Sequence, residues 1–302
     1  MAMTALLRPA RSDELQRLYD VWYRAETHDN PHPPAPGEPP MYLAHVLATG
    51  ILVVAEEAGE IRGFAGAITR GNVAFLTDLF VDPAYQSGGL GKTLLDAALP
   101  PTSGLTRCTL SSSDPRALAL YIRAGMQPQW TSFALRLETA VQRMPQAAQD
   151  ALNDVEIRLA DADDPALGAW DSRISGRPRA AERTFWTHEQ HAIPLWLLRR
   201  DQVIGYAYVR LDVGSLRDPH ACMVGPVGAN TPDDAATCAL ATVHWVAQRA
   251  AVLHMDVPGP HACLPLLLER GFRILYADTF VASASAPLFD ARCYIPSGSD
   301  LF

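Results

Sequence analysis

The chain has 302 residues, of which 48% are hydrophobic and 19% charged, and its formal net charge is −8 at pH 7. This composition is typical of a globular protein with room for two ordinary domains, and it excludes a largely disordered chain. The acidic balance argues against a general nucleic-acid binder and weakly favours cationic or neutral small-molecule partners. No apolar run reaches the length of a membrane span, and Arg8 and Arg11 interrupt the N-terminal segment before it could form a secretory signal.

The cysteines show no pairing pattern. Their number is odd and no CxxC motif occurs, so we expect reduced thiols in a cytoplasmic protein and no resident metal. The HEQH run at 188–191 lacks the spacing of a zinc motif and is interpreted as a surface helix. The five cysteines are Cys108, Cys222, Cys238, Cys263 and Cys293.

The first half of the chain alternates short strand and helix patterns. Apolar periodicity and the positions of glycine and proline set the boundaries of each element. The predicted order is strand 5–10, helix 11–25, proline-rich loop 26–40, helix 41–49, three strands within 51–81, helix 91–99, strand 105–110, helix 114–125 and strand 132–138.

A second copy of this pattern begins after a polar stretch. A constant shift of 146 residues aligns Val81 with Val227 and Gly125 with Gly271 without a gap. Few identities support the alignment, but the element order and the spacing do. The predicted organisation is a first domain over 1–138, a partly helical linker over 139–154 and a second domain with a C-terminal tail over 155–302.

A glycine-rich stretch, QSGGLGKT at 86–93, follows an apolar strand and opens the next helix. Glycine has no Cβ, so it tolerates positive φ and lets another molecule approach the backbone closely. The free N–H groups and the dipole at a helix start favour an anion. The stretch therefore predicts a site for a phosphate or pyrophosphate.

Two motifs resemble one family. The run VDPAYQSGGLG at 81–91 resembles the acetyl-CoA signature of the GNAT superfamily of N-acetyltransferases, and ALALYIRAGM at 117–126 is similar to that family's second motif. The two occur in the family's order, which makes them more specific than the glycine loop alone. The resemblance implies an α/β (α+β) fold of two tandem GNAT-type domains, each a mixed, largely antiparallel sheet flanked by helices.

The resemblance also implies acetyl-CoA as the co-substrate. Its pyrophosphate would lie on backbone amides of the glycine loop, with the Gln86 amide near a phosphate. Its pantetheine arm would pair with the end of the preceding strand, where the thioester carbonyl would accept a main-chain hydrogen bond. Ser87 departs from the more usual glycine, and Ser113 stands where asparagine is common. The implied cofactor-binding residues are Leu79, Phe80, Val81, Gln86, Ser87, Gly88, Gly89, Leu90, Gly91, Lys92, Thr93 and Ser113.

Tyr121 is the candidate general acid. The family's second motif often carries a tyrosine in this role, and a phenol with a pKa near 10 suits protonation of a departing thiolate. The alternative is a tyrosine that packs its helix, with its hydroxyl satisfied by a neighbour.

Asp78 is the candidate base. It lies on the strand beside the predicted acyl site, where a carboxylate can take a proton from an ammonium, directly or through water, or hold the cation. The alternative is an orienting carboxylate that hydrogen-bonds the loop backbone. Glu26, His28 and Asp29 lie in the predicted connection between the first two helices, which in the resembling family covers the acceptor site. They are candidates for substrate contact.

The second copy lacks these features. The 146-residue shift places PDDAAT at 232–237 on the glycine loop, so Asp233 and Asp234 stand where a pyrophosphate would lie. Carboxylates repel phosphates, and the added Cβ atoms block close approach. Leu267 falls on Tyr121. We therefore expect the second copy not to bind acetyl-CoA in the usual way and to support the first.

The predicted function is an acetyl-CoA-dependent N-acetyltransferase. It would move an acetyl group to a primary amine of a small molecule or a protein by direct attack in a ternary complex. The alternative is a non-catalytic acyl-CoA-binding sensor or interaction protein, and the presence of Tyr121 together with an intact loop favours the enzyme. We expect no nucleic-acid or membrane partner, and a homo-oligomer is compatible with the sequence.

Overall fold

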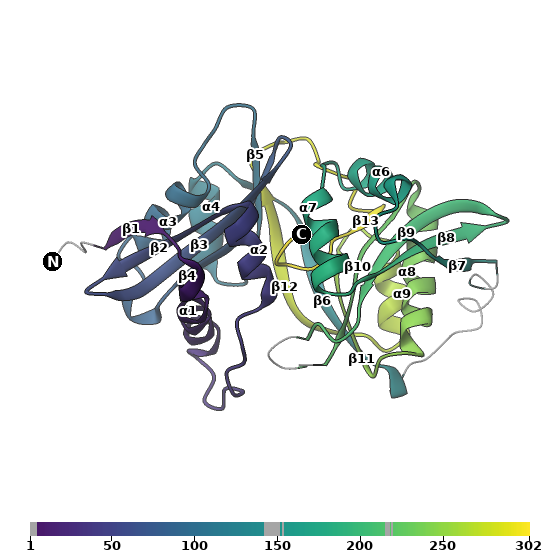
Figure 1. Ribbon diagram of the computed structural model, residues 1–302, viewed down its shortest axis with the longest axis horizontal. Coiled ribbons are helices and arrows are strands. Elements are labelled where there is room, and N and C mark those ends of the chain that lie inside the picture. Colours follow the sequence, from purple (N-terminus) through teal and green to yellow (C-terminus); the bar gives the residue numbers. More distant parts are fainter. Residues whose placement is uncertain (1–4, 142–151, 153, 215–217, 219) are drawn as a thin grey trace. The chain divides into compact units, whose positions relative to one another are not determined.

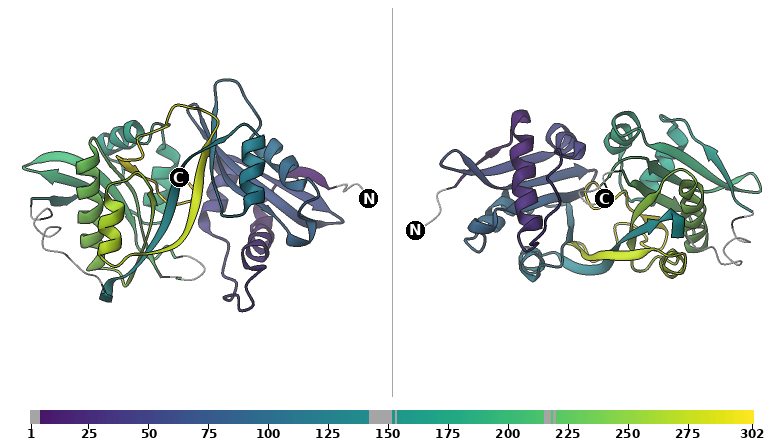
Figure 2. Two further views of the ribbon diagram at one scale, coloured as in Figure 1. Left: turned by 180° about the vertical axis from the view of Figure 1, so that it is seen from behind. Right: turned by 90° about the horizontal axis from the view of Figure 1, so that it is seen from below.

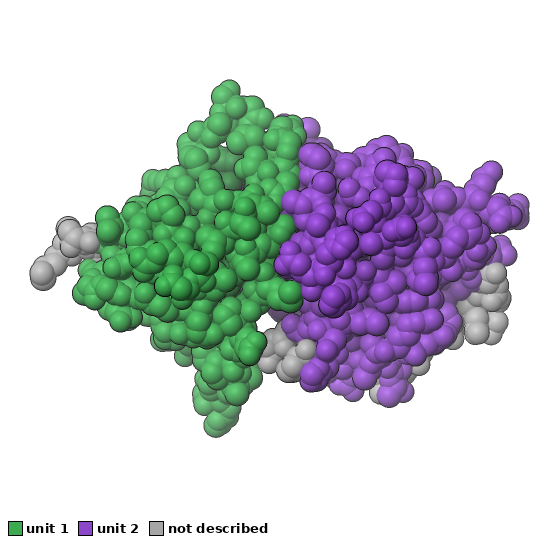
Figure 3. Space-filling model, viewed as in Figure 1, with its two compact units in different colours: residues 1–109 green, residues 110–302 purple. Residues whose placement is uncertain are grey.

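The computed structural model describes residues 5–141, 152, 154–214, 218 and 220–302. The chain divides into two compact units, Met1–Thr109 and Leu110–Phe302, which Figure 3 colours separately. This division does not coincide with the predicted domains, whose boundaries stay a prediction. Most of the predicted linker at 139–154 lies outside the described residues.

Unit 1 is built on a mixed, largely antiparallel sheet (Figure 1). Its first four strands pair antiparallel in chain order, and the start of the fifth runs parallel to the fourth. The strands are β1 (Leu6–Pro9), β2 (Ile51–Glu57), β3 (Glu60–Arg70), β4 (Val73–Val81) and β5 (Thr106–Ser111).

Helices cover both faces of this sheet. Helices α1 and α2 lie over one face and α3 over the other (Figure 1, Figure 2). A glycine on β3 brings α3 close, because a Cβ on Gly63 would stand 2.9 Å from Leu94 Cδ1. The helical segments are η1 (Ser12–Glu14), α1 (Leu15–Thr27), α2 (Met41–Thr49), η2 (Pro83–Tyr85) and α3 (Leu90–Ala98).

Unit 2 has a second mixed sheet, in the order β12-β6-β11-β10-β9-β8-β7, with β13 paired to β10. The strands are β6 (Gln127–Glu138), β7 (Glu156–Leu159), β8 (Ile193–Arg199), β9 (Gln202–Arg210), β10 (Cys222–Ala229), β11 (Val252–Pro258), β12 (Arg273–Ala282) and β13 (Tyr294–Ile295). The helical segments are α4 (Pro115–Arg123), η3 (Thr139–Val141), α6 (Pro165–Ile174), α7 (Ala180–Thr184), the π-helical η4 (Phe185–Glu189), α8 (Pro232–Ala247) and α9 (Cys263–Glu269).

Helices also cover both faces of the second sheet. A Cβ on Gly205 would meet Cys238 of α8 at 2.6 Å, whereas one on Gly228 would meet Ile174 of α6 at 3.0 Å. The apolar core gathers the inward side chains of β8–β11 against α8 and α9. The expected fold class, a mixed and largely antiparallel sheet flanked by helices, is confirmed in both units.

The last strand of the first predicted copy has an unexpected place. Strand β6 lies between β11 and β12 and pairs antiparallel with both. The 146-residue shift aligns β6 of the first copy with β12 of the second. The strand next to β11 is therefore β6, from the first copy, and β12 lies on the other side of β6. Alternating apolar residues on a strand specify which face is buried and not which strand is the neighbour.

Three carboxylates gather around one buried arginine in unit 2. Asp256 on β11 is buried, and burial together with nearby Asp278 and Asp300 raises its pKa to about 7, against the opposing effect of Arg210. The ordinary carboxyl pKa applies in the unfolded chain. The folded protein therefore binds a proton that the unfolded chain releases between roughly pH 4 and pH 7.

This difference predicts a pH-dependent stability. A folded-state pKa above the unfolded value means that the free energy of unfolding falls as pH rises through this window, by at most about 1.4 kcal/mol per pH unit. Asp256→Asn is neutral at every pH and should remove this part of the slope between pH 5 and pH 7. Denaturant unfolding of both chains across this range checks it. Parallel pH profiles would show that Asp256 is ionised in the folded protein.

Candidate functional site

The middle of β4 carries a bulge. Gly66 on β3 pairs with Asp78, whereas the next residue, Ala67, pairs with Leu76, so Thr77 is an extra residue on β4. A bulge bends its strand and turns side chains in a new direction. Gly66 makes room for this arrangement, because a Cβ there would stand 2.5 Å from Thr77 Oγ1.

Asp78 is held by hydroxyl groups. It is 3% exposed, and its Oδ1 accepts a 2.7 Å hydrogen bond from Tyr42 Oη of α2, while its Oδ2 accepts one of the same length from Thr77 Oγ1. The two donors hold the carboxylate on the α2 side of the sheet. Asp78 is therefore a positioned carboxylate, with the side chains of Tyr42 and Thr77 among its partners.

The loop after β4 is built around Asp82. Its Oδ1 accepts from Ala84 N at 3.1 Å and so caps the short helix η2, and its Oδ2 lies 3.0 Å from a guanidinium nitrogen of Arg24. The Gln86 amide turns back and donates to Val81 O at 3.2 Å. Contacts of the Gln86 side chain thus tie the loop to the strand end.

Positive backbone angles follow at two positions. Ser87 has φ +64° and Gly89 has φ +86°, a region that glycine enters without strain. A Cβ built on Gly89 meets no heavy atom within 4 Å. Open space therefore borders the backbone at the point where α3 begins.

The start of α3 leaves donors unused within the helix. Thr93 N–H makes the first helical bond, to Gly89 O at 3.2 Å, so the N–H groups of residues 89–92 have no acceptor inside the helix. In the described part of the chain, no side chain caps this end. Lys92 is exposed and pairs with Asp96 at 2.5 Å, whereas Leu90 packs into the core. Four N–H groups and the helix dipole thus favour an anion here.

The strand before the loop presents an edge. Strand β4 pairs with β5 over Val73–Phe75, whereas the pairing of β4 with β3 continues to Val81. Leu79, Phe80 and Val81 are half-buried and lie beyond the part paired with β5. An extended ligand can add to such an edge through main-chain hydrogen bonds.

A hollow of about 460 Å³ lies beside the same loop. Its lining residues are Arg24, Thr27, His28, Asp82, Pro83 and Ala84. Of the three predicted acceptor contacts, only His28 lines it. Glu26 was expected in the connection after the first helix, but it lies in the last turn of α1, because that helix continues to Thr27. Asp29 follows the helix and is exposed.

Tyr121 and Ser113 belong to unit 2. Tyr121 is the one buried residue of α4, at 5% exposure. Gly125, with φ +86°, lies just after the end of this helix. Asp114 caps α4 by accepting from Arg116 N at 2.8 Å. Ser113 is exposed, in the bend between β5 and α4.

The second copy has a helix where the first has its glycine loop. Helix α8 begins at Pro232, and its cap residue Thr231 accepts from Asp234 N at 3.2 Å. Asp234 also pairs with Arg199 at 2.6 Å. The side chains of Thr231 and Asp234 thus occupy the start of α8. Leu267, the counterpart of Tyr121, is fully buried.

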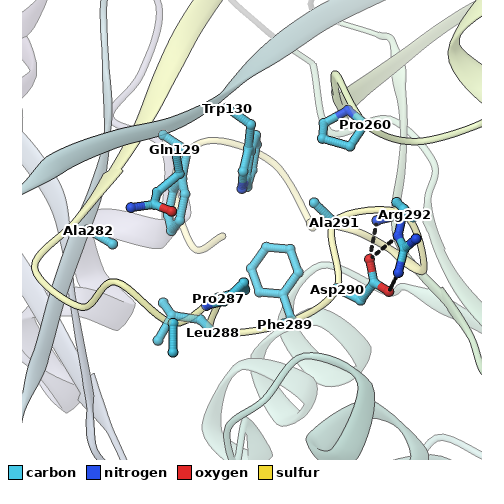
Figure 4. A pocket seen from close by; sticks show the side chains of 12 residues that line it. Gln129, Trp130, Pro260, Ala282, Pro287, Leu288, Phe289, Asp290, Ala291 and Arg292 are labelled. Carbon is cyan, nitrogen blue, oxygen red and sulfur yellow. Dashed lines mark hydrogen bonds and ion pairs between the residues drawn. The ribbon is translucent and has the colours of Figure 1, made fainter.

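A second cavity of about 580 Å³ lies within unit 2 (Figure 4). Trp130, stacked on Phe280 with ring centroids 4.6 Å apart, and Phe289 form its aromatic walls. Asp290 and Arg292 at its edge pair with each other at 2.7 Å. The charges at this edge are therefore mutually satisfied.

Among the described residues, no group of three or more His, Cys, Asp or Glu side chains is arranged to hold a metal ion. None of the helices in the same ranges combines the length and the apolar character needed to cross a bilayer.

Sequence reasoning missed two residues at this site. Tyr42 donates to Asp78 from a helix far away in the chain, and no local pattern indicates that contact. Arg24 pairs with Asp82 and lines the hollow. The Asp82-Pro83 dipeptide is a turn signal from which a helix cap could have been predicted.

Comparison with known proteins agrees with this architecture. Residues 13–126 match the model of the acetyltransferase (GNAT) family. A candidate acetyltransferase from Pyrococcus horikoshii is similar with a TM-score of 0.71 and 14% identity, over 100% of this chain and 98% of its own. A tandem GNAT protein from the clavulanic acid biosynthesis pathway gives 0.60 and 15%, over 94% and 99%. No curated protein matches significantly.

A third solved structure, a GCN5-related N-acetyltransferase from Sphaerobacter thermophilus, gives a TM-score of 0.62 and 14% identity, over 92% of this chain and 95% of its own. At such identities the structures show the fold alone. Together with the family match, they confirm the resemblance to the GNAT superfamily in its tandem two-domain form. Family and fold support acetyl transfer in general.

Proposed function

We propose that this protein is an acetyl-CoA-dependent N-acetyltransferase whose first copy holds the acyl donor. The observation that supports this proposal most directly is the start of α3, which no side chain of the described residues caps. The N–H groups of residues 89–92 have no acceptor within the helix there. Gly89 adds open space beside them. A pyrophosphate matches this arrangement in charge and in hydrogen-bonding capacity.

The edge of β4 supports a place for the pantetheine arm. Leu79, Phe80 and Val81 lie beyond Val73–Phe75, the part of β4 that pairs with β5, and the glycine loop follows them. A main-chain N–H at this edge could donate to the thioester carbonyl and stabilise the oxyanion that forms when an amine attacks. The acyl group would then lie near the bulge that positions Asp78.

The proton transfers are assigned to two side chains. Asp78 takes the proton that the attacking ammonium must lose, and Tyr121 gives one to the departing thiolate. The attack forms a bond between the amine nitrogen and the carbonyl carbon, and collapse of the intermediate breaks the carbon–sulfur bond. The second proton that the nitrogen loses restores the Tyr121 hydroxyl, and Asp78 releases its proton to solvent. The products are an amide and CoA with a free thiol. The acceptor is a primary amine of a small molecule or a peptide, and His28 is its best-supported contact because it lines the hollow.

Amine-dependent release of free thiol tests this function. The full chain is incubated with acetyl-CoA and a panel of primary amines, and the thiol is followed with a chromogenic disulfide. The account expects release above the rate of hydrolysis with one class of amine, together with acetylated amine in equal amount. Binding of CoA with acetyl-CoA left intact across small amines and peptides would instead indicate a binding protein.

Asp78→Asn separates a base from a structural carboxylate. As the base, Asp78 should contribute about 10²-fold to kcat, with the affinity for CoA nearly unchanged. Tyr42→Phe is the matched control, because it removes the 2.7 Å hydrogen bond and keeps the carboxylate. Equal losses in both variants would mean that Asp78 acts by holding α2 in place and not by taking a proton.

A further inference from the structure

The edge of β10 in unit 2 is filled by another part of the chain. Strand β10 pairs with β9 along one edge. Along its other edge it pairs with β11 at Cys222 and Met223. Beyond that point β13 pairs antiparallel with β10 and also contacts β11. In unit 1 the pairing of β4 with β5 stops in the same way, at Phe75.

The occupant of this edge is the segment 293–302, here called the tail segment. Ile295 pairs with Val227 and Tyr294 with Gly228, and Ala229 N donates to Cys293 O at 3.0 Å. The tail segment is thus an added antiparallel strand. It follows the exposed residues 285–287, which are drawn in yellow near the end of the chain (Figure 1).

Buried arginines hold the rest of the tail segment through its backbone. Arg210 donates to Ser297 O, Arg177 donates to Phe302 O, and Arg179 donates to Phe302 O at 3.0 Å. All three guanidinium groups are buried. Loss of these carbonyl acceptors would leave buried charge less well satisfied, which is strongly unfavourable.

The tail segment also contributes apolar anchors. The side chains of Tyr294, Ile295, Leu301 and Phe302 are fully buried. The Phe302 ring stacks on Phe280 with centroids 4.9 Å apart. Burial of these large apolar side chains stabilises the bound state. The tail segment thus combines apolar anchors with backbone contacts, as do peptides bound by strand addition.

The backbone of β10 leaves room for the tail segment. A Cβ on Gly225 would stand 2.3 Å from Pro296 O, so only glycine permits this approach. In contrast, the connection before the tail segment includes the exposed residues 285–287, and Pro287 and Leu288 line the cavity of Figure 4. The chain can therefore be cut at these exposed residues.

We propose that unit 2 contains a peptide-binding groove along the edge of β10 beyond Met223, and that its ligand is the tail segment of the same chain. The groove recognises an extended peptide through the main chain of Val227–Ala229 and through the arginines that bind its carbonyls. Its position corresponds to the β4 edge assigned to pantetheine in the first copy. That correspondence rests on the proposed function, whereas the groove does not.

Nicking the folded full chain tests the groove. A protease recognition sequence is inserted between the exposed residues Ser285 and Ala286, and the protein is cleaved after it has folded. The fragment 286–302 should stay bound to the body during gel filtration without denaturant. A fluorescent synthetic peptide of residues 286–302, in excess, should then replace it at one site per chain, whereas the uncleaved chain should not take up the peptide.

Two variants of the peptide test whether binding depends on its buried anchors. Phe302→Asp, in the synthetic peptide, should weaken binding at least 100-fold, whereas Ala286→Asp at the exposed start should have almost no effect. Release of the fragment on cleavage, or equal uptake of both peptides, would overturn the proposal. None of these readouts involves acetyl-CoA, so a chain that transfers no acetyl group would still report on the groove.

Discussion

Tyr121→Phe is expected to lower kcat by about 10²–10⁴-fold, the usual scale for losing a general acid. The CoA thiolate is a poor leaving group without a proton, and phenylalanine keeps the ring that is buried on α4 while it removes the hydroxyl. The affinity for CoA should change little, because the proposed phosphate contacts come from the loop of residues 86–93. Free-thiol release at saturating acceptor measures kcat, and calorimetry measures the affinity.

The control for this variant is Tyr276→Phe, which removes a hydroxyl from a side chain of unit 2 that is 51% exposed. It should have normal kcat. If Tyr121 has only a structural role, Tyr121→Phe should lower the melting temperature and should lower the measured kcat only through the loss of folded protein. Near-normal kcat in folded Tyr121→Phe would therefore remove this residue from the acid role.

Gly89→Val is expected to abolish CoA binding, with an affinity at least 100-fold lower. Gly89 has φ +86°, where a β-branched residue is strained, and its missing Cβ leaves the space that a phosphate needs. Strain of this kind costs about 1–3 kcal/mol, so the protein should remain folded. Calorimetry with CoA measures the affinity, and circular dichroism checks the fold.

Gly104→Val is the matched control for this change. Gly104 lies in the same unit, has φ +82° and has no heavy atom within 4 Å of a Cβ. Both substitutions therefore impose similar backbone strain, but only one lies at a helix start. Unchanged CoA affinity in folded Gly89→Val would refute the pyrophosphate site, and equal loss in both variants would assign the effect to stability.

The sequence was sufficient to predict the start of α3 because the signal is local. Glycines before a helix specify a backbone that can turn and a helix end without a side-chain cap, and the structure has both at Gly89. Strand alternation likewise predicted the sheets and their helical cover. The 146-residue shift predicted that PDDAAT at 232–237, which has no glycine, takes the place of the glycine loop, and α8 begins there at Pro232.

Contacts between distant segments could not be predicted in this way. Gln86 turns back to Val81 O, although its amide was expected near a phosphate, because a carbonyl at the strand end lies within reach. Asp78 is bonded by Tyr42, from a helix with no sequence link to it. The tail segment pairs with β10 through backbone groups, and backbone pairing leaves no side-chain pattern.

Titration of the unmodified full chain with CoA tests the central claim most directly. Within the described ranges, no side chain caps the start of α3 at Gly89, where we propose the pyrophosphate site, whereas the start of α8 is capped by Thr231 and carries Asp234. The account predicts saturable binding of one CoA per chain, weakened by added salt and competed by acetyl-CoA. Binding of two CoA per chain, or the absence of binding at millimolar CoA, would contradict it.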